Sequence, residues 1–458
     1  MAGATAVATV LCAVRGPGEA GVVTALDAPG SGLQVTRRCA DVVELLAAAA
    51  AGAGRVAVVS ADLPSLDRDA IAHLHAHAVR VVAIAGQPWE RDMLVTLGVD
   101  TVVDLSAPAA GLRDAVRDTA RGASAAPGGP ALPPTAPQES ALGSQAPRDG
   151  RLVAVWGPTG APGRTTLAVN LAAELSGPRA PGRRPRRARR AVSEVDLPAT
   201  APRGPEADVV LVDADTYGGT IAQRLGLLDE SPGLAAAARG AAQGMLSAAT
   251  LARLTPVVAP RLRVLTGIAR AARWPELPGP SLDAVWDVTR TLADWTVVDC
   301  GFCVERDELL SYDTRAPQRN GATLSALSAA DAVVVVGSAD PVGLQRLVRS
   351  LDELADSGVA LSAERVVVVN RVRAAVVGPR PESAVRLAME RYAGVADLFV
   401  VPEDGALDVA LREGRTLPEV SPSGSARRAV ARVAEHLREV VPARPAPGSA
   451  ARSLEAAH

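Results

Sequence analysis

Short apolar segments alternate with helix-like segments along most of the chain. Over residues 1–122, each of four segments of strand length rich in Val and Ala is followed by a stretch with apolar positions at helical spacing. One such stretch, residues 42–52, is rich in Ala and ends at a glycine, as helices often do. Strands that alternate with helices predict a parallel sheet joined by right-handed crossovers. The four strand segments are 8–14, 55–64, 79–86 and 99–108.

The alternation resumes near residue 150. A strand over 152–157 leads through a glycine-rich turn into a helix over 167–175. A helical region is expected over 219–253, and an amphipathic helix over 425–440. Near-continuous Val and Leu runs are typical of strands buried on both faces, so we predict a second α/β domain with a mostly parallel sheet covered by helices. Its further strands are expected at 208–215, 262–267, 294–301, 331–340, 364–372 and 397–404.

Three segments lack the large apolar residues that a folded core needs. Residues 123–149 contain six prolines and are predicted to be a flexible linker between domains at 1–122 and 150–441. Within the second domain, residues 176–207 hold eight Arg against three acidic residues and are expected to form a disordered, solvated insert. The tail, 442–458, is also expected to be disordered.

Composition narrows the functional classes. The 458 residues carry 48 basic and 50 acidic side chains, so a net charge of −2 gives no overall field that attracts nucleic acid or anionic membranes. Every basic residue other than His is Arg. The chain has no positively charged leader and no apolar run of 18 residues, which favours a cytoplasmic location. Four cysteines are too few for a disulfide framework and fit a reducing compartment (Cys12, Cys39, Cys300 and Cys303).

The most informative segment is the glycine-rich turn over 157–166. Glycines let the backbone turn its N–H groups inward, and the following helix adds partial positive charge, so the turn suits phosphate groups. Thr165 occupies the position whose hydroxyl binds Mg²⁺ in a P-loop, and Arg164 the position of its lysine. This chain also departs from the usual pattern GxxxxGK[ST] at its first glycine, where it has Pro158. From the turn alone, a strand-to-helix connection without a ligand remains an alternative.

Six segments in order resemble the MinD/ParA family of deviant-Walker P-loop ATPases, and within it the CpaE/TadZ-like proteins of pilus assembly and polar positioning. The resemblance spans about 150–441. Residues 159–166 look like the family's KGGxGKTT, Asp213-Ala-Asp215 resembles its DxD, and WTVVDCG with Asp299 resembles its Walker B strand. The other three segments are DAVVVVGSADPVGLQRL, VVVVNRV and VVPEDGALDVALREGRTLPEV. The implied fold is a P-loop NTPase of the SIMIBI type.

The resemblance also implies ligands and residue roles. The cofactors would be ATP and Mg²⁺, with Thr165, Asp299 and Asp213 serving the metal. Asp215 would orient the attacking water, and Arg164 would assist at the phosphates. The nucleotide would be held by Gly160, Ala161, Pro162, Gly163, Arg164, Thr165 and Thr166 at its phosphates and by Asn370, Pro402 and Asp404 near adenine.

Two departures affect the expected activity. Thr159 replaces the signature lysine that in this family reaches the partner subunit's phosphates, and Arg164 replaces the Walker lysine. A planar guanidinium differs in geometry from a compact ammonium, and phosphoryl transfer depends on positioning. We therefore expect ATP binding, while hydrolysis is left open. Arg319 is a candidate arginine to act on the partner subunit in place of the lysine.

The implied function is nucleotide-dependent dimerisation that positions a protein partner, either pilus or secretion machinery or the division site. One alternative is a catalytically inert ATP-binding scaffold. Another is a ParA-like chromosome or plasmid partitioning protein that binds DNA non-specifically through the Arg-rich residues 179–190. Peripheral attachment to the inner face of the membrane is a further expectation, either through the same residues or through the helix over 425–440. For that helix we favour a role as the last helix covering the sheet.

Residues 1–122 resemble a response-regulator receiver domain, which has a flavodoxin-like fold. The phosphoacceptor position, four residues before Pro64, is Ser60. The acidic pair expected after the first strand is absent, and Asp104 stands where a lysine belongs. We therefore predict a pseudo-receiver used for docking or dimerisation. Asp62 is an alternative phosphoacceptor, but a solvated loop carboxylate is favoured.

Two remaining patterns suggest metal or redox chemistry but are better explained without it. Cys300 and Cys303 form a CxxC, yet no second CxxC completes a zinc site, so we favour buried small side chains over a redox pair. His73, His75 and His77 are spaced two apart on a predicted helix and face different directions.

Overall fold

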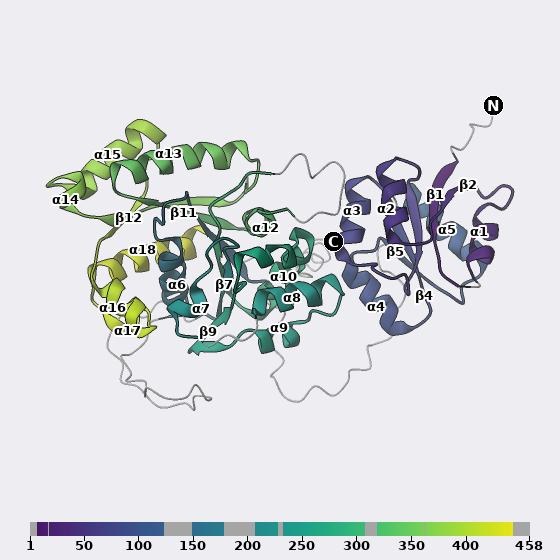
Figure 1. The fold of residues 1–458 in the computed structure, drawn as a ribbon, viewed down its shortest axis with the longest axis horizontal. Helices are drawn as coiled ribbons and strands as arrows, with labels where there is room; N and C mark the ends of the chain where they lie inside the picture. Colours follow the sequence, from purple (N-terminus) through teal and green to yellow (C-terminus); the bar gives the residue numbers. More distant parts are fainter. Residues whose placement is uncertain are drawn as a thin grey trace, which may run out of the picture. The chain divides into compact units, whose positions relative to one another are not determined.

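The computed structural model describes residues 7–16, 18–122, 149–177, 207–227, 232–306, 318–360 and 362–442. They form two compact units (Figure 1). The predicted linker up to residue 148, the insert from 178 to 206 and the tail from 443 lie outside the described residues. Within the described residues, no helix is both long and apolar enough to cross a membrane.

The N-terminal unit is a five-stranded parallel sheet with the strand order β2-β1-β3-β4-β5. This is the flavodoxin-like order, so the predicted fold class of the unit is confirmed. Two apolar clusters, one on each face, hold the helices to the sheet. The strands are β1 (Ala8–Ala13), β2 (Leu33–Arg38), β3 (Val56–Ser60), β4 (Arg80–Ala85) and β5 (Thr101–Asp104). The helices are α1 (Glu19–Leu26), α2 (Val42–Ala50), α3 (Arg68–Ala76), α4 (Pro88–Leu97) and α5 (Ala109–Ala120).

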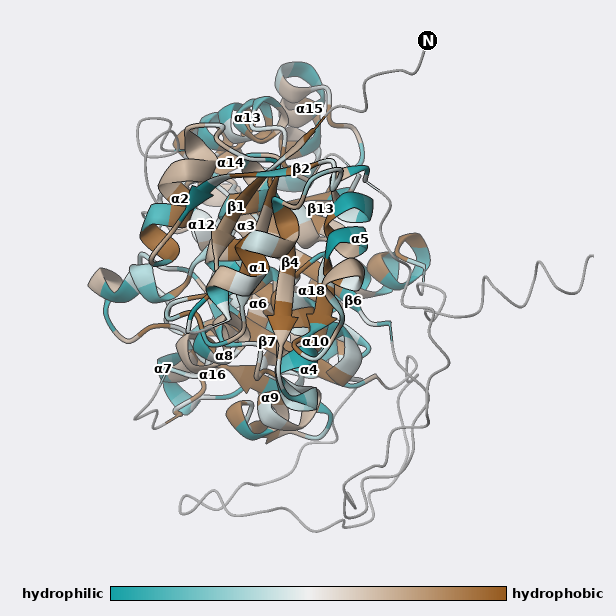
Figure 2. Ribbon diagram, turned by 90° about the vertical axis from the view of Figure 1, so that its right-hand side faces the viewer, coloured by the Kyte–Doolittle hydropathy of each residue, from teal (hydrophilic) through white to brown (hydrophobic). Residues whose placement is uncertain are grey.

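The C-terminal unit contains an eight-stranded sheet in the order β13-β12-β11-β6-β10-β7-β9-β8. All its strand pairs are parallel except β8 with β9, so the prediction of a mostly parallel sheet covered by helices is confirmed. Figure 2 shows that apolar residues concentrate on the strands, as expected for a sheet buried on both faces. The strands are β6 (Arg151–Trp156), β7 (Val209–Ala214), β8 (Val257–Ala259), β9 (Leu262–Leu265), β10 (Trp295–Cys300), β11 (Ala332–Ser338), β12 (Glu364–Val372) and β13 (Phe399–Pro402).

Helices cover this sheet in two groups. The helix α6 (Arg164–Leu175) packs against α18 (Ser425–Val440), while α10 (Gly279–Leu292) packs against α12 (Gly321–Ala329). The apolar positions Val430, Val433 and Leu437 of α18 are buried and Val440 is partly buried, which confirms that this helix covers the core as favoured from the sequence. The remaining helical segments are α7 (Ile221–Arg224), α8 (Gly233–Ala242), α9 (Ala248–Leu254), η1 (Ala271–Glu276), α13 (Pro341–Asp356), α14 (Ala374–Val377), α15 (Pro381–Ala393), α16 (Ala406–Glu413) and α17 (Leu417–Val420).

Two buried polar side chains on α6 fix this helix within the unit. The Glu174 carboxylate accepts two hydrogen bonds from Arg427 of α18, at 2.6 and 2.8 Å. Burial raises the pKa of Glu174, and the Arg427 guanidinium opposes that rise. The Oδ1 atom of Asn170 accepts a hydrogen bond of 2.7 Å from the Leu417 amide. These bonds hold the helix at whose N-terminus the glycine-rich turn lies.

Candidate functional site

The turn between β6 and α6 is shaped by its glycines. Gly160 and Gly163 have φ angles of 99° and 100°, and Ala161 has a φ of 53°, so three residues lie in the left-handed region. Gly157 is required for a different reason, because a side chain there would collide with the backbone of Val336 in β11. The chain therefore turns sharply where β6 meets α6, as the sequence pattern predicted.

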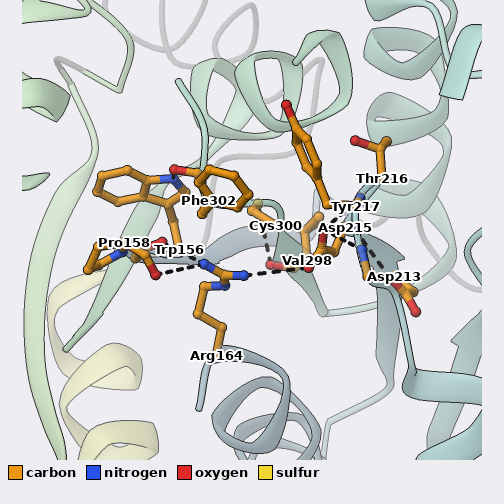
Figure 3. Close-up of polar contacts among 12 residues, drawn as sticks. Trp156, Pro158, Arg164, Asp213, Asp215, Thr216, Tyr217, Val298, Cys300 and Phe302 are labelled. Atoms are coloured by element: carbon orange, nitrogen blue, oxygen red, sulfur yellow. Dashed lines mark hydrogen bonds and ion pairs between the residues drawn. The ribbon is translucent and has the colours of Figure 1, made fainter. Parts of the chain in front are cut away.

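Two side chains hold the turn in place through its carbonyl groups. The Nη1 atom of Arg164 donates to the carbonyl oxygens of Gly157, at 2.7 Å, and Pro158, at 3.0 Å (Figure 3). The Nδ2 atom of Asn370, at the end of β12, donates to the carbonyl oxygen of Pro162 at 2.9 Å. The predicted phosphate ligand Arg164 and the predicted adenine contact Asn370 thus both bind the turn itself.

Three carboxylates lie at the carboxyl ends of the strands beside the turn. The strand β10 runs between β6 and β7, and its Asp299 is in register with Val155 on one side and Asp213 on the other. Asp215 follows directly after β7. Asp299, Asp213 and Asp215 are 0%, 3% and 7% exposed. The structure therefore brings together the predicted metal and catalytic carboxylates.

Asp299 differs from the other two carboxylates in accepting no backbone hydrogen bond, and the Thr165 hydroxyl is the polar group beside it. Neither of its carboxylate oxygens has a hydrogen-bond partner within the described chain. Burial raises the pKa of Asp299 well above its usual range, and the nearby Asp213 raises it further, while Thr165 and Arg164 oppose this. A buried carboxylate without a partner is costly, so Asp299 is an electrostatically unsatisfied group beside the start of α6.

The other two carboxylates are engaged by the backbone. Asp213 accepts hydrogen bonds from the amides of Asp215, at 3.3 Å, and Ile221, at 3.0 Å. Burial raises the pKa of Asp213 to about 7, although the Ile221 amide opposes this. Asp215 accepts from the amides of Tyr217, at 2.9 Å, and Gly218, at 3.2 Å, and its Oδ2 atom lies 3.5 Å from Nη2 of Arg164.

Asp299 and Thr165 fit Mg²⁺ as part of a larger set of ligands. Mg²⁺ prefers oxygen ligands and is usually bound by one or two carboxylates together with phosphate oxygens and water. Asp299 offers two free oxygens, and the Thr165 hydroxyl is the neighbouring neutral oxygen. No set of three or more His, Cys, Asp or Glu side chains is arranged to hold a metal in the part of the chain that the structure describes. Asp299 and Thr165 would therefore hold Mg²⁺ only together with ligands from elsewhere.

The residues predicted to lie near adenine contact different structural partners within the unit. Pro402 ends β13 and is paired in register with Val372 of β12. The Asp404 carboxylate accepts hydrogen bonds from the amides of Ala406, at 3.0 Å, and Ala426, at 3.2 Å. These bonds, the one from Ala406 first, lower the pKa of Asp404, which joins the start of α16 to the start of α18. Asp404 thus has a structural role, and contact with a base stays a prediction.

Arg319 is bound within its own chain. Its guanidinium donates to the side chain and carbonyl of Thr216, at 2.7 and 3.0 Å, and stacks over the Tyr217 ring, with Cζ 3.8 Å from the ring centroid. The Tyr217 hydroxyl in turn donates to Asn320 Oδ1 at 2.7 Å. These contacts tie the segment after Asp215 to the start of α12. No sequence pattern indicated this cluster, because its members are about 100 positions apart.

Other patterns from the sequence have structural partners. Cys300 is buried in β10, which raises the pKa of its thiol well above the usual value, and Cys303 accepts a hydrogen bond from Asn320. Ser60 ends β3, and its hydroxyl accepts a hydrogen bond from the Arg15 amide. Asp104 is exposed and bonded to Ser106.

Of the two histidines in α3 and the one that caps its C-terminus, His73 and His77 lie together, with ring centroids 4.5 Å apart, so the expectation that all three face different directions is wrong for this pair. His75 Nε2 lies 2.7 Å from an Asp100 oxygen, while His77 Nδ1 lies 3.0 Å from the His73 carbonyl oxygen. The predicted nucleic-acid contact at 179–190 lies outside the described residues.

Comparisons with known proteins gave similarities of structure only. The sequence matches no protein-family model, and no curated protein is similar to it. Among solved structures, the chain is similar to a ParA family ATPase from Chlorobium tepidum TLS, with 17% identity and a TM-score of 0.48 over 64% of this chain and 100% of that one. It is also similar to the septum site-determining protein MinD from Pyrococcus horikoshii OT3, in complex with Mg-ADP, with 16% identity and a TM-score of 0.45 over 64% and 97%. A third similar structure is a variant of McdA from Cyanothece in complex with ATP, with 16% identity and a TM-score of 0.45 over 65% of this chain and 98% of that one.

Proposed function

We propose that residues 150–441 form a MinD/ParA-like domain that binds ATP and Mg²⁺ at the turn between β6 and α6. The observation that carries the proposal is Asp299, a fully buried carboxylate with two unpartnered oxygens at the carboxyl end of β10. Such a group is costly unless a cation or a donor satisfies it. Its position beside a glycine-rich helix N-terminus, which favours phosphate, makes a phosphate-bound Mg²⁺ the ligand that fits both features.

In this proposal the chain supplies binding groups of three kinds. The backbone N–H groups of residues 160–165 other than Pro162, together with the N-terminus of α6, bind the phosphates, with Thr166 in the first turn. Asp299 and the Thr165 hydroxyl hold Mg²⁺, which neutralises phosphate charge. Asp213, in register with Asp299 on the neighbouring strand, accepts the Ile221 amide and so fixes the start of α7. Asn370 keeps the turn in shape through Pro162, and with Pro402 and Asp404 it belongs to the side on which the base is expected.

Hydrolysis would require a rearrangement. Asp215, the proposed residue for orienting water, is paired with Arg164, and Arg164 is also bonded to two carbonyl groups of the turn. Both side chains would have to separate before Asp215 could position water and Arg164 could reach a phosphate. We therefore propose slow turnover. The pairing of Arg164 with Asp215 also favours a second candidate function, an ATP-binding scaffold without turnover.

The wider role is proposed from the sequence resemblance. Binding of ATP would promote a homodimer that positions a partner from pilus or secretion machinery or from the division site, in the cytoplasm or at the inner membrane face. Residues 1–122 would serve as a pseudo-receiver for docking. The partitioning alternative depends on DNA binding through residues 179–190, so deletion of that segment with a DNA-binding assay separates it from the others.

The direct test is a nucleotide titration of the full chain. We expect ATP with Mg²⁺ to bind the unmodified protein, and the Thr165→Ala and Asp299→Asn variants to lose the Mg²⁺-dependent part of the affinity. Matched controls are Thr291→Ala and Asp352→Asn, two exposed positions away from the turn. Size-exclusion chromatography with and without ATP reports dimerisation, and a single-turnover assay separates slow hydrolysis from none. Equal affinity in all five proteins would refute the proposed site.

A further inference from the structure

A second arginine reaches the glycine-rich turn from a distant part of the chain. Arg346 is in the second turn of α13, and its guanidinium lies against Gly160. A methyl group built on Gly160 would lie 3.3 Å from Cζ and 3.8 Å from Cδ of Arg346 and would collide with one terminal nitrogen. Gly160 is thus the residue that leaves room for this side chain on the exposed face of the turn.

The position of Arg346 is fixed by the start of its helix. The Asp340 side chain caps α13 by accepting a hydrogen bond of 2.9 Å from the Gly343 amide. The next residue along, Leu347, is fully buried and packs so closely on Gly337 of β11 that a side chain at position 337 would overlap it. Because β11 is paired with β6, this packing brings the first turns of α13 beside the end of β6, where the glycine-rich turn begins.

Arg346 is also an available cation, in contrast to Arg164 and Arg319. Arg164 is held by two carbonyl groups and Asp215, and Arg319 is held by Thr216 and Tyr217. Arg346 is exposed, and it forms no hydrogen bond or ion pair with any residue that the structure describes. The chain has no lysine that could supply the charge instead.

We propose that Arg346 is a phosphate-binding residue that contacts the oxygens of a bound polyphosphate from the open side of the turn. This inference rests on the proposed nucleotide site, for which the unpartnered Asp299 is the independent indication of a ligand. A guanidinium binds phosphate through two parallel N–H donors, and such charge-assisted bonds are stronger than neutral ones. The chain thereby supplies from α13 a positive charge that its lysine-free turn lacks.

The test compares nucleotide affinities of three full-length proteins: unmodified, Arg346→Ala and Arg349→Ala. Arg349 is an exposed arginine on the same helix and serves as the control for charge and helix propensity. We expect Arg346→Ala to weaken ATP and ADP binding about 10-fold or more, to leave adenosine binding unchanged and to keep the melting temperature of the ligand-free protein. Arg346→Lys should recover part of the loss, and Arg349→Ala should behave like the unmodified protein.

The outcomes separate this inference from the proposed function. If the unmodified protein binds ATP and Arg346→Ala binds it equally or more tightly, the role of Arg346 is refuted while the nucleotide site stands. If adenosine binding falls as much as ATP binding, the side chain shapes the site rather than contacting phosphate, which also refutes the inference. If the unmodified protein binds no nucleotide, both the proposed function and the role of Arg346 are wrong.

Discussion

The Nη2 atom of Arg164 lies 3.5 Å from the Oδ2 atom of Asp215, and both side chains are almost fully buried. The same guanidinium also donates to the carbonyl groups of Gly157 and Pro158. One side chain therefore connects the end of β6, the start of α6 and the residue after β7. A compact ammonium at this position has no planar array of donors with which to make the same set of bonds.

Truncation of Arg164 should destabilise the second unit. The Arg164→Ala variant removes two charge-assisted hydrogen bonds and leaves Asp215 buried without its counter-charge, which together should cost about 3 kcal/mol. Urea unfolding followed by tryptophan fluorescence measures the loss, since Trp156, Trp286 and Trp295 are buried in this unit. Arg349→Ala is the control for the loss of an exposed arginine. A loss below 0.5 kcal/mol would mean, contrary to our expectation, that these contacts contribute little.

The Asp299→Asn substitution should have the opposite effect in the ligand-free protein. Burial and Asp213 raise the pKa of Asp299, so at neutral pH the folded protein must either bury its charge or bind a proton, and a neutral amide removes this cost; the free energy of unfolding should therefore rise by about 1–3 kcal/mol. The same variant should lose the stabilisation that Mg²⁺ and ATP give the unmodified protein in a thermal melt. Asp352→Asn, on an exposed face of α13, controls for the change of charge. Destabilisation of the ligand-free variant would contradict the view that Asp299 is electrostatically unsatisfied.

The sequence predicted the strands best where they are buried on both faces. The Val-rich segments that became β10, β11 and β12 have no other stable environment than the centre of a sheet. Two strands were not predicted. β2 is a half-exposed edge strand, LQVTRR, with little apolar pattern, and β8 has only three residues. Their formation depends on pairing with β1 and β9, which only the folded sheet provides.

The site was predictable in its location but not in its contacts. Buried aspartates at strand ends and a glycine-rich turn identify the carboxyl edge of the sheet, because parallel strands bring these ends together. The bond from Asn370 to Pro162 joins residues 208 positions apart, and the packing of Arg346 on Gly160 joins α13 to the turn. Such contacts depend on the spacing of helices and strands in three dimensions, and no pattern of neighbouring residues encodes them.

The bonding of Asn370 leads to a prediction that separates two roles. If its amide acts by holding the turn through Pro162, Asn370→Ala should weaken ATP and GTP binding by the same factor, about 5-fold for one hydrogen bond. If the amide contacts adenine instead, ATP affinity should fall while GTP affinity does not. A competition assay with the two nucleotides gives both numbers. We expect the equal loss, since the donor nitrogen is 2.9 Å from the Pro162 carbonyl oxygen.

The cysteines should differ in reactivity despite the CxxC spacing. Cys12, Cys39 and Cys300 are buried, and burial raises the pKa of each of these thiols, so little thiolate is available at neutral pH. Cys303 is partly exposed. Brief treatment with iodoacetamide should therefore modify Cys303 first, as measured by peptide mass spectrometry, and urea should expose the other three. Recovery of a Cys300–Cys303 disulfide from the untreated protein would contradict this prediction.

In the N-terminal unit, the contacts of Asp100 predict loss of stability in acid. Burial alone would raise the pKa of Asp100, but hydrogen bonds from His75, Arg80 and the Val81 amide outweigh it and lower the pKa to about 2. A carboxyl group whose pKa is lower in the folded state contributes stability above its ordinary pKa near 4 and loses it as the pH falls towards 2. Asp100→Asn should therefore lower the free energy of unfolding by about 1–2 kcal/mol at pH 6, with a difference that shrinks between pH 4 and pH 2. Thermal melts of both proteins by circular dichroism across this range, with the exposed Asp92→Asn as control, give the difference at each pH. A difference that stays constant down to pH 2 would show that the effect of the substitution is not linked to ionisation of Asp100.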